Sequence, residues 1–574
     1  MRKGRSIAVG ILALIFTASL LTALARAQVQ PSNSREVKVI VGGTLIDGTG
    51  RAPVSDAVIV IEGNTIKAVG VKGKITPPAG ARVLDATGEF VLPGFTDCHI
   101  HYRDWLGEML LAHGVTSICD NGNPTDWVLA QRDAIAKGKV IGPRIWASGD
   151  QLGTRAPARN PEEALKTVRE HIAKGVNKIA MTLPLDPPTM KVIIDEAHKA
   201  GIPVSTLSMY PRDAIALGVD LFEHSYTLFF GTKKGAVLEE IHRELLADVG
   251  RYDMKWEKYL MDADNDDFID LLVKHGTYIM PNMIYDFKVI HDRYKEFERE
   301  SIELATNPNL KYIPVDDWLP QLTSNNEAGR RFDVGLPPFE GEDTEYYKAW
   351  KKVYRIQQEF IRKFVKAGGK ILVGSDAPNK MLPGLAFHHE MQLLVDAGLT
   401  PMEVIVAGTS RPAQFLRQQD RLGTVEAGKL ADIVILRANP LQDITNARKI
   451  DTVIKDGNVV DTTYHPDFAN PIPRPISQES GRNPLPSLTN LLPKVATEGD
   501  GDLVLTIQGN DFFKESVAVF DGQRVPTVFV KDTELKATVP ARLLQRVGTF
   551  PVTVWNPRPF GGTSNDVKFI VKFK

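Results

Sequence analysis

The chain has 574 residues, of which 43% are hydrophobic, so it is long enough for two or three globular domains with their own cores. Lysine and arginine (69) almost balance aspartate and glutamate (70), which leaves a formal net charge of -1. This balance excludes a protein that binds nucleic acid or an acidic membrane through a strongly basic surface. We therefore expect a small-molecule substrate and no nucleic-acid partner.

The N-terminus has the layout of a secretory signal. Three basic residues precede an uncharged run over residues 7–25, and an A-x-A motif follows at residues 25–27. We expect a signal peptide over residues 1–27, a mature chain that starts near Gln28, and an exported protein that is periplasmic or extracellular and has no membrane contact after cleavage. A retained N-terminal anchor is the alternative, because the apolar run is long enough to span a bilayer.

Residues 37–92 and 415–463 have the pattern of β-strands. Short runs rich in β-branched residues, such as "VKVIVGGTLIDGTG" and "KIDTVIKDGNVVD", lie between turns that contain glycine and asparagine. The first segment predicts antiparallel strands. Because the second segment resembles the first, we expect the two to pair in one small composite β-sandwich.

Between these flanks, apolar runs alternate with segments of helical periodicity. The eight candidate strands are "FTDCHIH", "GVTSICDNG", "PRIWASGD", "NKIAMTL", "IPVSTLSM", "DLFEHSY", "TYIMPNM" and "KILVGSDAP". Eight such units predict an α/β fold, a (β/α)₈ TIM barrel over residues 93–414. Residues 285–370 show no strand pattern and are charged and aromatic, so we expect a helical excursion that forms a lid over the barrel mouth.

The first two candidate strands contain the only cysteines of the chain, Cys98 and Cys119. Export would permit a disulfide bond between them. Two buried free thiols are the favoured prediction.

The C-terminal part separates into a linker and a further domain. Six prolines lie between residues 466 and 486, which predicts an extended Pro-rich linker over residues 464–486. Residues 487–574 contain β-strand patterns at near-regular spacing with Gly, Asp and Pro turns. We expect a separate Ig-like β-sandwich there.

The stretch "VLPGFTDCHIHYRDW" ends the first barrel strand with His99 and His101. Side chains alternate between the two faces of a strand, so both imidazoles face the same side, and both can face the barrel lumen. They lie at the end of the strand where barrel enzymes build their sites. Two neutral imidazoles at this end predict a divalent metal site. The alternative is a pair of core histidines with satisfied hydrogen bonds.

Asp376 follows the last candidate strand, and His224 follows the sixth. A closed barrel makes its first and last strands neighbours, so Asp376 should lie beside the two histidines as a metal ligand and proton acceptor. A helix N-cap is the alternative for Asp376. His224 is a further candidate ligand, with a capping or core histidine as the alternative. The sequence "FHHE" (residues 387–390) is a weaker candidate near the mouth.

These motifs carry a resemblance. "VLPGFTDCHIH", "FEHS", "GSDAP" and "RLGTVEAGKLADIVILRANPLQDI" resemble the amidohydrolase superfamily, in particular its secreted imidazolonepropionase-like and Xaa-Pro-dipeptidase-like branch. The end of the chain, "GTFPVTVWNPRPFGGTSNDVKFIV", resembles an IPT/TIG immunoglobulin-like domain.

The amidohydrolase resemblance implies that a metal-activated water attacks the carbon of an amide, lactam or related C–N bond. It implies that His99, His101 and Asp376 bind the metal and that Asp376 also moves the proton. It further implies that His224 is an additional ligand or polarises the substrate carbonyl.

The sequence departs from the family pattern at two strands. Family members usually carry a carboxylated, metal-bridging lysine at the end of the fourth strand, where this chain has Ala180. Lys178 faces the same side one layer deeper, so a buried or paired structural lysine is the favoured interpretation. Where the fifth strand usually ends in a histidine, this chain has Leu207 and Ser208. We therefore expect one divalent metal, with zinc first and iron, manganese or nickel as alternatives.

Two hypotheses follow. The first is a secreted single-metal hydrolase of amide, cyclic amide or dipeptide-like C–N bonds. The second is a degenerate barrel that binds a ligand or surface without turnover, with the C-terminal domain contacting a surface or polymer. The sequence leaves a homo-oligomer open and does not identify the substrate.

Overall fold

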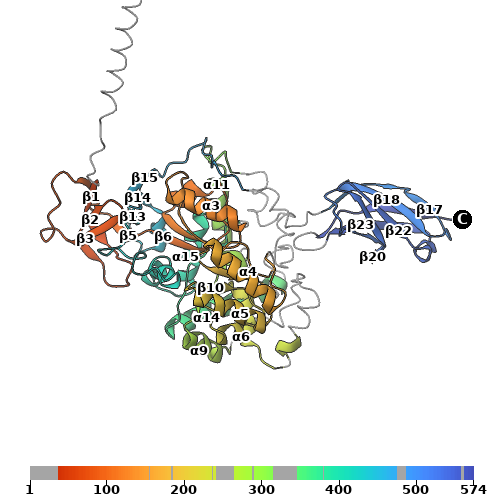
Figure 1. Cartoon of the computed structure of the whole chain (residues 1–574), viewed down its shortest axis with the longest axis horizontal. Helices are drawn as coiled ribbons and strands as arrows, with labels where there is room; N and C mark the ends of the chain where they lie inside the picture. Colours follow the sequence, from red (N-terminus) through yellow and green to blue (C-terminus); the bar gives the residue numbers. More distant parts are fainter. Residues whose placement is uncertain are drawn as a thin grey trace, which may run out of the picture.

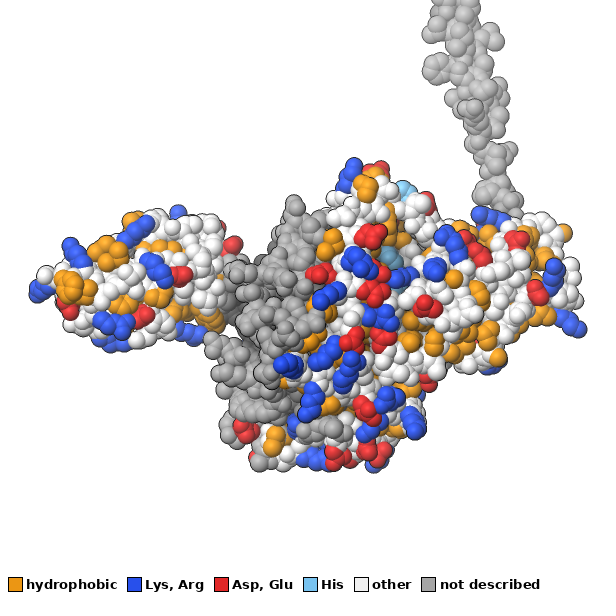
Figure 2. All heavy atoms as spheres, turned by 180° about the vertical axis from the view of Figure 1, so that it is seen from behind, with side chains coloured by type: hydrophobic (Ala, Val, Ile, Leu, Met, Phe, Trp, Pro, Cys, Tyr) orange, Lys and Arg blue, Asp and Glu red, His pale blue; other side chains and the backbone are white. Residues whose placement is uncertain are grey.

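The computed structural model describes residues 36–153, 156–182, 185–235, 237–240, 264–287, 290–313, 345–378, 381–474, 486–556 and 562–574. The expected signal peptide over residues 1–27 lies outside these ranges. Within them, no helix combines the length and hydropathy needed to cross a bilayer. On the face drawn in Figure 2, acidic and basic side chains are interspersed over the barrel, as the balanced composition predicts.

The central domain is the predicted parallel barrel. Its strands form two sheets, one of β6 (Phe95–Ile100), β7 (Val115–Asp120) and β8 (Arg144–Ala147), and one of β9 (Ile179–Met181), β10 (Val204–Thr206), β11 (Leu221–Glu223) and β12 (Tyr278–Met280). The eighth candidate, residues 370–378, forms parallel bridges on both sides, Ile371 with Ile279 and Ala377 with Ile100. These bridges link the seventh strand to the first, and the predicted fold class is confirmed.

Helices follow the barrel strands in chain order (Figure 1). They are α2 (Gly107–Ala112), α3 (Thr125–Ala136), α4 (Pro161–Lys174), α5 (Pro187–Lys199), α6 (Pro211–Ala216), α9 (Asp266–His275), α14 (Glu345–Lys366), α15 (Leu385–Asp396), α16 (Pro401–Ala407) and α17 (Ser410–Phe415). Local sequence fixes their ends. In α4, the Asn160 side chain accepts a hydrogen bond from the backbone N–H of Glu163, and Gly175 ends the helix at φ 88°.

The stretch over residues 285–370 contains α11 (Tyr294–Ala305) and α14 among its described residues. Helix α14 buries Phe360 and Phe364 in the core that the barrel shares with its helices, and Phe360 stacks on Phe268 of α9 with ring centroids 6.3 Å apart. Helix α14 therefore belongs to the layer of helices around the barrel rather than to an excursion over the mouth. Its apolar face is buried against the core of this layer. Residues 314–344 lie outside the described residues, and the lid role stays a prediction.

The two flanking segments pair in one sheet, as expected. Strand β13 (Ile433–Leu436) pairs antiparallel with β5 (Phe90–Pro93), and the strand order is β15-β14-β13-β5-β1-β2-β3. The further strands are β1 (Val37–Leu45), β2 (Val54–Glu62), β3 (Thr65–Val71), β4 (Arg82–Asp85), β14 (Ile450–Lys455) and β15 (Asn458–Val460). The predicted antiparallel pairing is confirmed for β1 with β2 and for β2 with β3, and it is wrong for β4 and β5, which both pair parallel with β1. The intervening β2–β3 hairpin gives the chain enough length to return in the same direction.

The start of the Pro-rich segment is docked on the barrel rather than extended away from it. Gln131 of α3 donates a hydrogen bond to the carbonyl oxygen of Ile472 at 2.5 Å, and the guanidinium of Arg474 donates to Asn123 at 2.9 Å. Tyr464 and Ile472 pack against apolar clusters of the barrel domain. The prediction of a Pro-rich linker did not include this docking, in which the apolar and polar side chains of residues 464–474 find partners on the barrel domain. Residues 475–485 lie outside the described residues.

The C-terminal domain, blue in Figure 1, consists of two sheets around its own core. One sheet has the order β16 (Ser487–Leu492), β18 (Leu503–Asn510), β22 (Glu534–Val539), β21 (Thr527–Lys531). The other has the order β17 (Val495–Thr497), β25 (Val567–Lys572), β23 (Gly548–Asn556), β19 (Val517–Phe520), β20 (Gln523–Arg524), with β24 (Gly562–Thr563) beside β23. Alternate residues such as Leu505 and Ile507 point into the core, as the predicted Ig-like sandwich requires.

Candidate metal centre

The first barrel strand and the last one are held together next to the candidate ligands. The buried carboxylate of Asp97 accepts hydrogen bonds from the backbone N–H and the hydroxyl of Ser375 at 3.0 and 2.6 Å. One residue beyond Ser375 and two beyond Asp97, the backbone N–H of Asp376 donates to the carbonyl of His99 at 2.8 Å. These bonds fix the relative height of the two strand ends, so His99 and Asp376 lie side by side as the closed barrel predicts.

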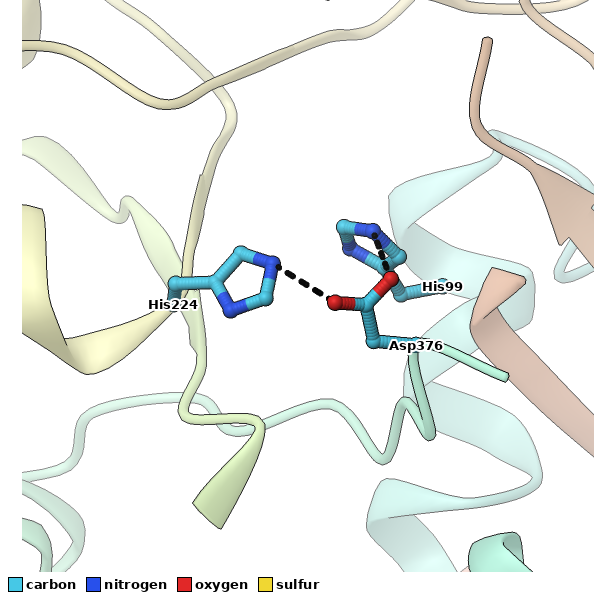
Figure 3. Close-up of side chains that lie close together, drawn as sticks. All are labelled: His99, His224 and Asp376. Carbon is cyan, nitrogen blue, oxygen red and sulfur yellow. Dashed lines mark ion pairs between the residues drawn. The ribbon is translucent and has the colours of Figure 1, made fainter. Parts of the chain in front are cut away.

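The carboxylate of Asp376 is the point at which the imidazoles meet. Its Oδ1 lies 3.3 Å from His99 Nε2 and 3.0 Å from His101 Nε2. Its Oδ2 lies 3.5 Å from His224 Nε2. Figure 3 shows the rings of His99 and His224 approaching this carboxylate from different elements. All four sequence-predicted site residues therefore converge.

Three of the four residues form the tightest group. Donor atoms of His99, His224 and Asp376 all lie within 4.8 Å of one another, and all three residues are buried. The side chain of His101 contacts Asp376 but is more exposed, at 13%, and its ring centroid lies 5.4 Å from that of His99. His224, expected as an additional ligand, is thus as central as His99.

His224 is oriented by a residue that the sequence analysis missed. Asp286, in the short helix α10 (Met283–Asp286), contacts His224 Nδ1 at 2.9 Å. The other carboxylate oxygen of Asp286 accepts hydrogen bonds from the backbone N–H and the hydroxyl of Ser225, both at 2.8 Å. With the proton of Nδ1 donated to Asp286, Nε2, which faces Asp376, is the nitrogen that would bind a cation.

Left-handed backbone conformations place these side chains. His224 and Asp376 have φ values of 61° and 56°, and Asn282, after the seventh strand, has a φ of 50°. Non-glycine residues rarely adopt this region, and such strain is common at functional sites. The Asn282 side chain donates a hydrogen bond to the carbonyl of Gly374 at 3.0 Å, which ties this turn to the last strand.

Charges inside the site are strongly coupled. Burial alone would raise the pKa of Asp376, but the imidazoles of His99, His101 and His224 hold it well below its ordinary value. Burial alone would lower the pKa of His224, but the carboxylates of Asp286 and Asp376 raise it to about 9. Without a metal, His224 is therefore protonated at neutral pH, and a bound cation would replace this proton on Nε2 beside the ionised carboxylate of Asp376.

The distances between the oxygens of Asp376 and the imidazole nitrogens are close to the ligand spacing of a small divalent ion. Ligands of a tetrahedral zinc ion lie about 2.1 Å from the metal and therefore about 3.4 Å from one another. The distances from Asp376 to the three imidazoles are 3.3, 3.0 and 3.5 Å. Imidazole nitrogen and carboxylate oxygen also suit iron, manganese and nickel. The residues present can hold one divalent metal.

Below this group lies a second layer of buried polar side chains. Lys178 and Glu223 face each other with 3.4 Å between Nζ and Oε1, and Asn121 contacts both. Burial alone would raise the pKa of Glu223, but the charge of Lys178 and the imidazole of His99 lower it to about 2. The favoured interpretation of Lys178, a buried and paired lysine, agrees with these contacts.

The other departures from the family pattern leave no ligand in their places. Ala180 is a buried strand residue, and the hydroxyl of Ser208 lies 3.4 Å from the sulfur of Met190. The "FHHE" residues lie elsewhere on α15, where His388 bonds to the carbonyl of His113 and His389 pairs with Glu300 at 2.8 Å. These two histidines are not part of the group around Asp376.

The two thiols beside the site are free and buried, which confirms the favoured prediction. Cys98 and Cys119 have sulfur atoms 3.7 Å apart. Both side chains lie in a small apolar cluster with Leu221 and Met280.

Asn121, Glu223 and Asp286 are the functional candidates that sequence reasoning missed. Asn121 and Glu223 each stand next to a motif that was noticed, in "CDNG" and "FEHS". A polar residue at the end of an apolar strand was the available signal. Asp286 lies in the loop region after the seventh strand and has no such signal, because its role depends on the fold of α10.

Comparison with known proteins agrees with this geometry. A model of the amidohydrolase family matches residues 90–460, and a model of the IPT/TIG domain matches residues 486–571. The imidazolonepropionase of Porphyromonas gingivalis is 23% identical over 424 residues, which cover 71% of this chain and 90% of that protein. The imidazolonepropionase of Haloarcula marismortui is 40% identical over 79 residues, which cover 13% of this chain and 18% of that protein.

Two solved structures show the same fold. A Xaa-Pro dipeptidase with bound methionine in its active site has a TM-score of 0.53 and 22% identity, and the match covers 74% of this chain and 100% of that one. Phenylurea hydrolase B also has a TM-score of 0.53 and 22% identity, and the match covers 77% of this chain and 100% of that one. With the family model matching more than half of its length, the chain belongs to the amidohydrolase family and ends in an IPT/TIG domain.

Proposed function

We propose that this protein is an exported hydrolase that cleaves C–N bonds with the help of a single divalent metal. The family match and its hydrolase relatives support the reaction class. The export part of the proposal rests on the signal-like sequence of residues 1–27. Zinc is our first choice of metal.

The observation that carries the proposal is the convergence of His99 and His224 on the carboxylate of Asp376. Their donor atoms lie within 4.8 Å of one another at the carboxyl ends of three barrel strands. Active sites of barrel enzymes are built at this end of the strands. Three protein ligands leave an open position on a zinc ion, which is the arrangement of a catalytic site.

When bound, a divalent ion at this position would polarise a substrate carbonyl and activate water. The residues of the chain then have separate tasks. Asp376 accepts the proton of the attacking water and returns it to the leaving nitrogen, since its carboxylate is ionised and central. His224 stays in one tautomer because Asp286 holds its Nδ1. His101 is the most exposed of the three imidazoles, and we assign it the contact with an entering substrate.

We propose amides, cyclic amides and dipeptide-like compounds as substrates. The names of the similar proteins support this range: imidazolonepropionase, a Xaa-Pro dipeptidase and phenylurea hydrolase B. A screen of N-acyl amino acids, cyclic ureides and X-Pro dipeptides against metal-loaded protein tests it. The alternative of a non-catalytic binding protein would be supported by less than about 0.2 equivalents of zinc, manganese or iron after metal-supplemented expression.

The replacement Asp376→Asn tests the mechanism. It keeps the size of the side chain and removes the proton acceptor, so turnover of an accepted substrate should fall roughly 10²–10⁴-fold. Asp396→Asn is the matched control, because Asp396 pairs with Arg293 away from the site and should leave turnover unchanged. Full activity of the Asp376→Asn variant would remove Asp376 from the mechanism.

A further inference from the structure

A cation-binding position lies beneath the candidate metal centre, and a side chain of the protein already fills it. Glu223 Oε1 and Asn121 Oδ1 both point at Lys178 Nζ, at 3.4 and 3.2 Å. A carboxylate oxygen and an amide oxygen that face one point are ligands that hard divalent cations use. All three side chains are buried, with at most 1% exposure.

This position is connected to the metal centre through His99. Glu223 Oε2 lies 3.6 Å from His99 Nδ1, and Asn121 Nδ2 lies 3.1 Å from His99 Nε2. Asn121 also donates a hydrogen bond to Glu223 Oε2 at 2.7 Å, which fixes the direction of its amide. Within the part of the chain that the structure describes, His99 Nδ1 has no hydrogen-bond partner closer than this carboxylate.

The charge of Lys178 also opposes a second divalent ion at this position. Glu223 and Asn121 hold the ammonium at 3.4 and 3.2 Å, and all three side chains are buried. A divalent ion bound to the same two oxygens would lie in contact with that ammonium in a buried volume, which is strongly unfavourable.

We propose that Lys178 is a built-in cation that holds Glu223 beside His99 and keeps this position closed to a second divalent ion. The inference rests on the proposed function, since it concerns the number of metal ions in the same site. Lys178 acts through Glu223 and is therefore a positioning residue. Its removal should open the position to a metal rather than simply weaken the fold.

The test measures bound metal instead of activity. Purified full-length protein, stripped with a chelator and dialysed against zinc or manganese, should bind about one equivalent. The Lys178→Met variant should bind about one equivalent more, because Glu223 and Asn121 then face an empty position. The double variant Lys178→Met, Glu223→Gln should return to about one equivalent, because the carboxylate ligand is gone.

Two further variants serve as controls. Lys178→Arg keeps the charge and should bind as much metal as the parent protein. Lys38→Met removes another buried lysine that pairs with a glutamate. Lys38 lies on β1, outside the barrel, and its Nζ is 2.6 Å from Glu36. Its metal content should equal that of the parent protein.

The outcomes separate the two proposals. A parent protein that binds no metal contradicts the proposed function, whereas unchanged metal content in the Lys178→Met variant contradicts the role of Lys178. If this variant is unfolded without metal, manganese at millimolar concentration should restore its circular dichroism spectrum by filling the vacated position. Failure of both zinc and manganese to restore the fold would also overturn the inference.

Discussion

Replacing Asp286 by asparagine isolates the contribution of the residue that orients His224. The carboxylate accepts three hydrogen bonds, from His224 Nδ1 at 2.9 Å and from the backbone N–H and hydroxyl of Ser225 at 2.8 Å. Asparagine keeps the shape but offers only one accepting oxygen and an N–H₂ group. Either the imidazole or Ser225 then faces a donor instead of an acceptor.

The expected loss can be worked out from the bond that is broken. A hydrogen bond to a charged group contributes about 1.5–3 kcal/mol. At about 1.4 kcal/mol per factor of ten, this corresponds to a metal dissociation constant roughly 10- to 100-fold higher. The dissociation constant is measured by zinc competition with a chromogenic chelator, and circular dichroism checks that the variant is folded.

A matched control distinguishes this role from a general effect of lost charge. Asp292 lies six residues further on and pairs with Lys351 and Arg355 at the surface. Asp292→Asn should leave the metal dissociation constant unchanged. If the Asp286→Asn variant is folded and binds zinc within about threefold of the parent protein, the assigned hydrogen-bond geometry at His224 is wrong.

Two further predictions follow from buried contacts. Burial raises the pKa of Glu390 to about 8, so the folded state keeps a proton that the unfolded state loses near pH 4.5. The contribution of Glu390 to stability is therefore present below pH 4.5 and is lost as the pH rises to about 8, by up to about 1.4 kcal/mol per pH unit. Denaturant unfolding of the parent protein and of Glu390→Gln at pH 5 and pH 8 checks it, and a stability difference independent of pH would contradict it. In Gly374→Ala, the new Cβ would lie 2.2 Å from Met280 Sδ and 2.9 Å from His99 Cβ, so zinc affinity should fall and unfolding should cost about 1–3 kcal/mol less. Gly501→Ala should change neither zinc affinity nor stability, because a Cβ at this position meets nothing within 4 Å. Normal zinc binding by Gly374→Ala would show that the position of His99 does not depend on this close packing.

The barrel and the main ligands could be predicted because they depend on local patterns. Each of the eight strands is a short apolar run with polar residues at its end, and side-chain alternation puts His99 and His101 on one face. Closure of the barrel then requires Asp376 to lie near them, and the structure shows 3.3 and 3.0 Å. The parallel pairing of β1 with β5 could not be predicted, because strand direction depends on the path of the chain between them.

The docking of residues 464–474 was also invisible in the sequence. Prolines predict an extended backbone, and this says nothing about whether the extended segment lies free or on another surface. The hydrogen bond from Gln131 to Ile472 joins residues that are 341 positions apart. The position of α14 could not be predicted either. Its helical pattern is plain in the sequence, but its place in the layer of helices around the barrel depends on contact with α9.

By itself, the sequence determined which residues can bind a metal and at which end of which strand they stand, because periodicity and strand ends are properties of neighbouring residues. The tertiary structure decided which of them meet and what supports them. His224 joins His99 and Asp376 in the central group, while Asp286 and the Lys178–Glu223 pair take up positions behind the imidazoles. Contacts between distant elements set these roles, since burial and charge neutralisation act through space rather than along the chain.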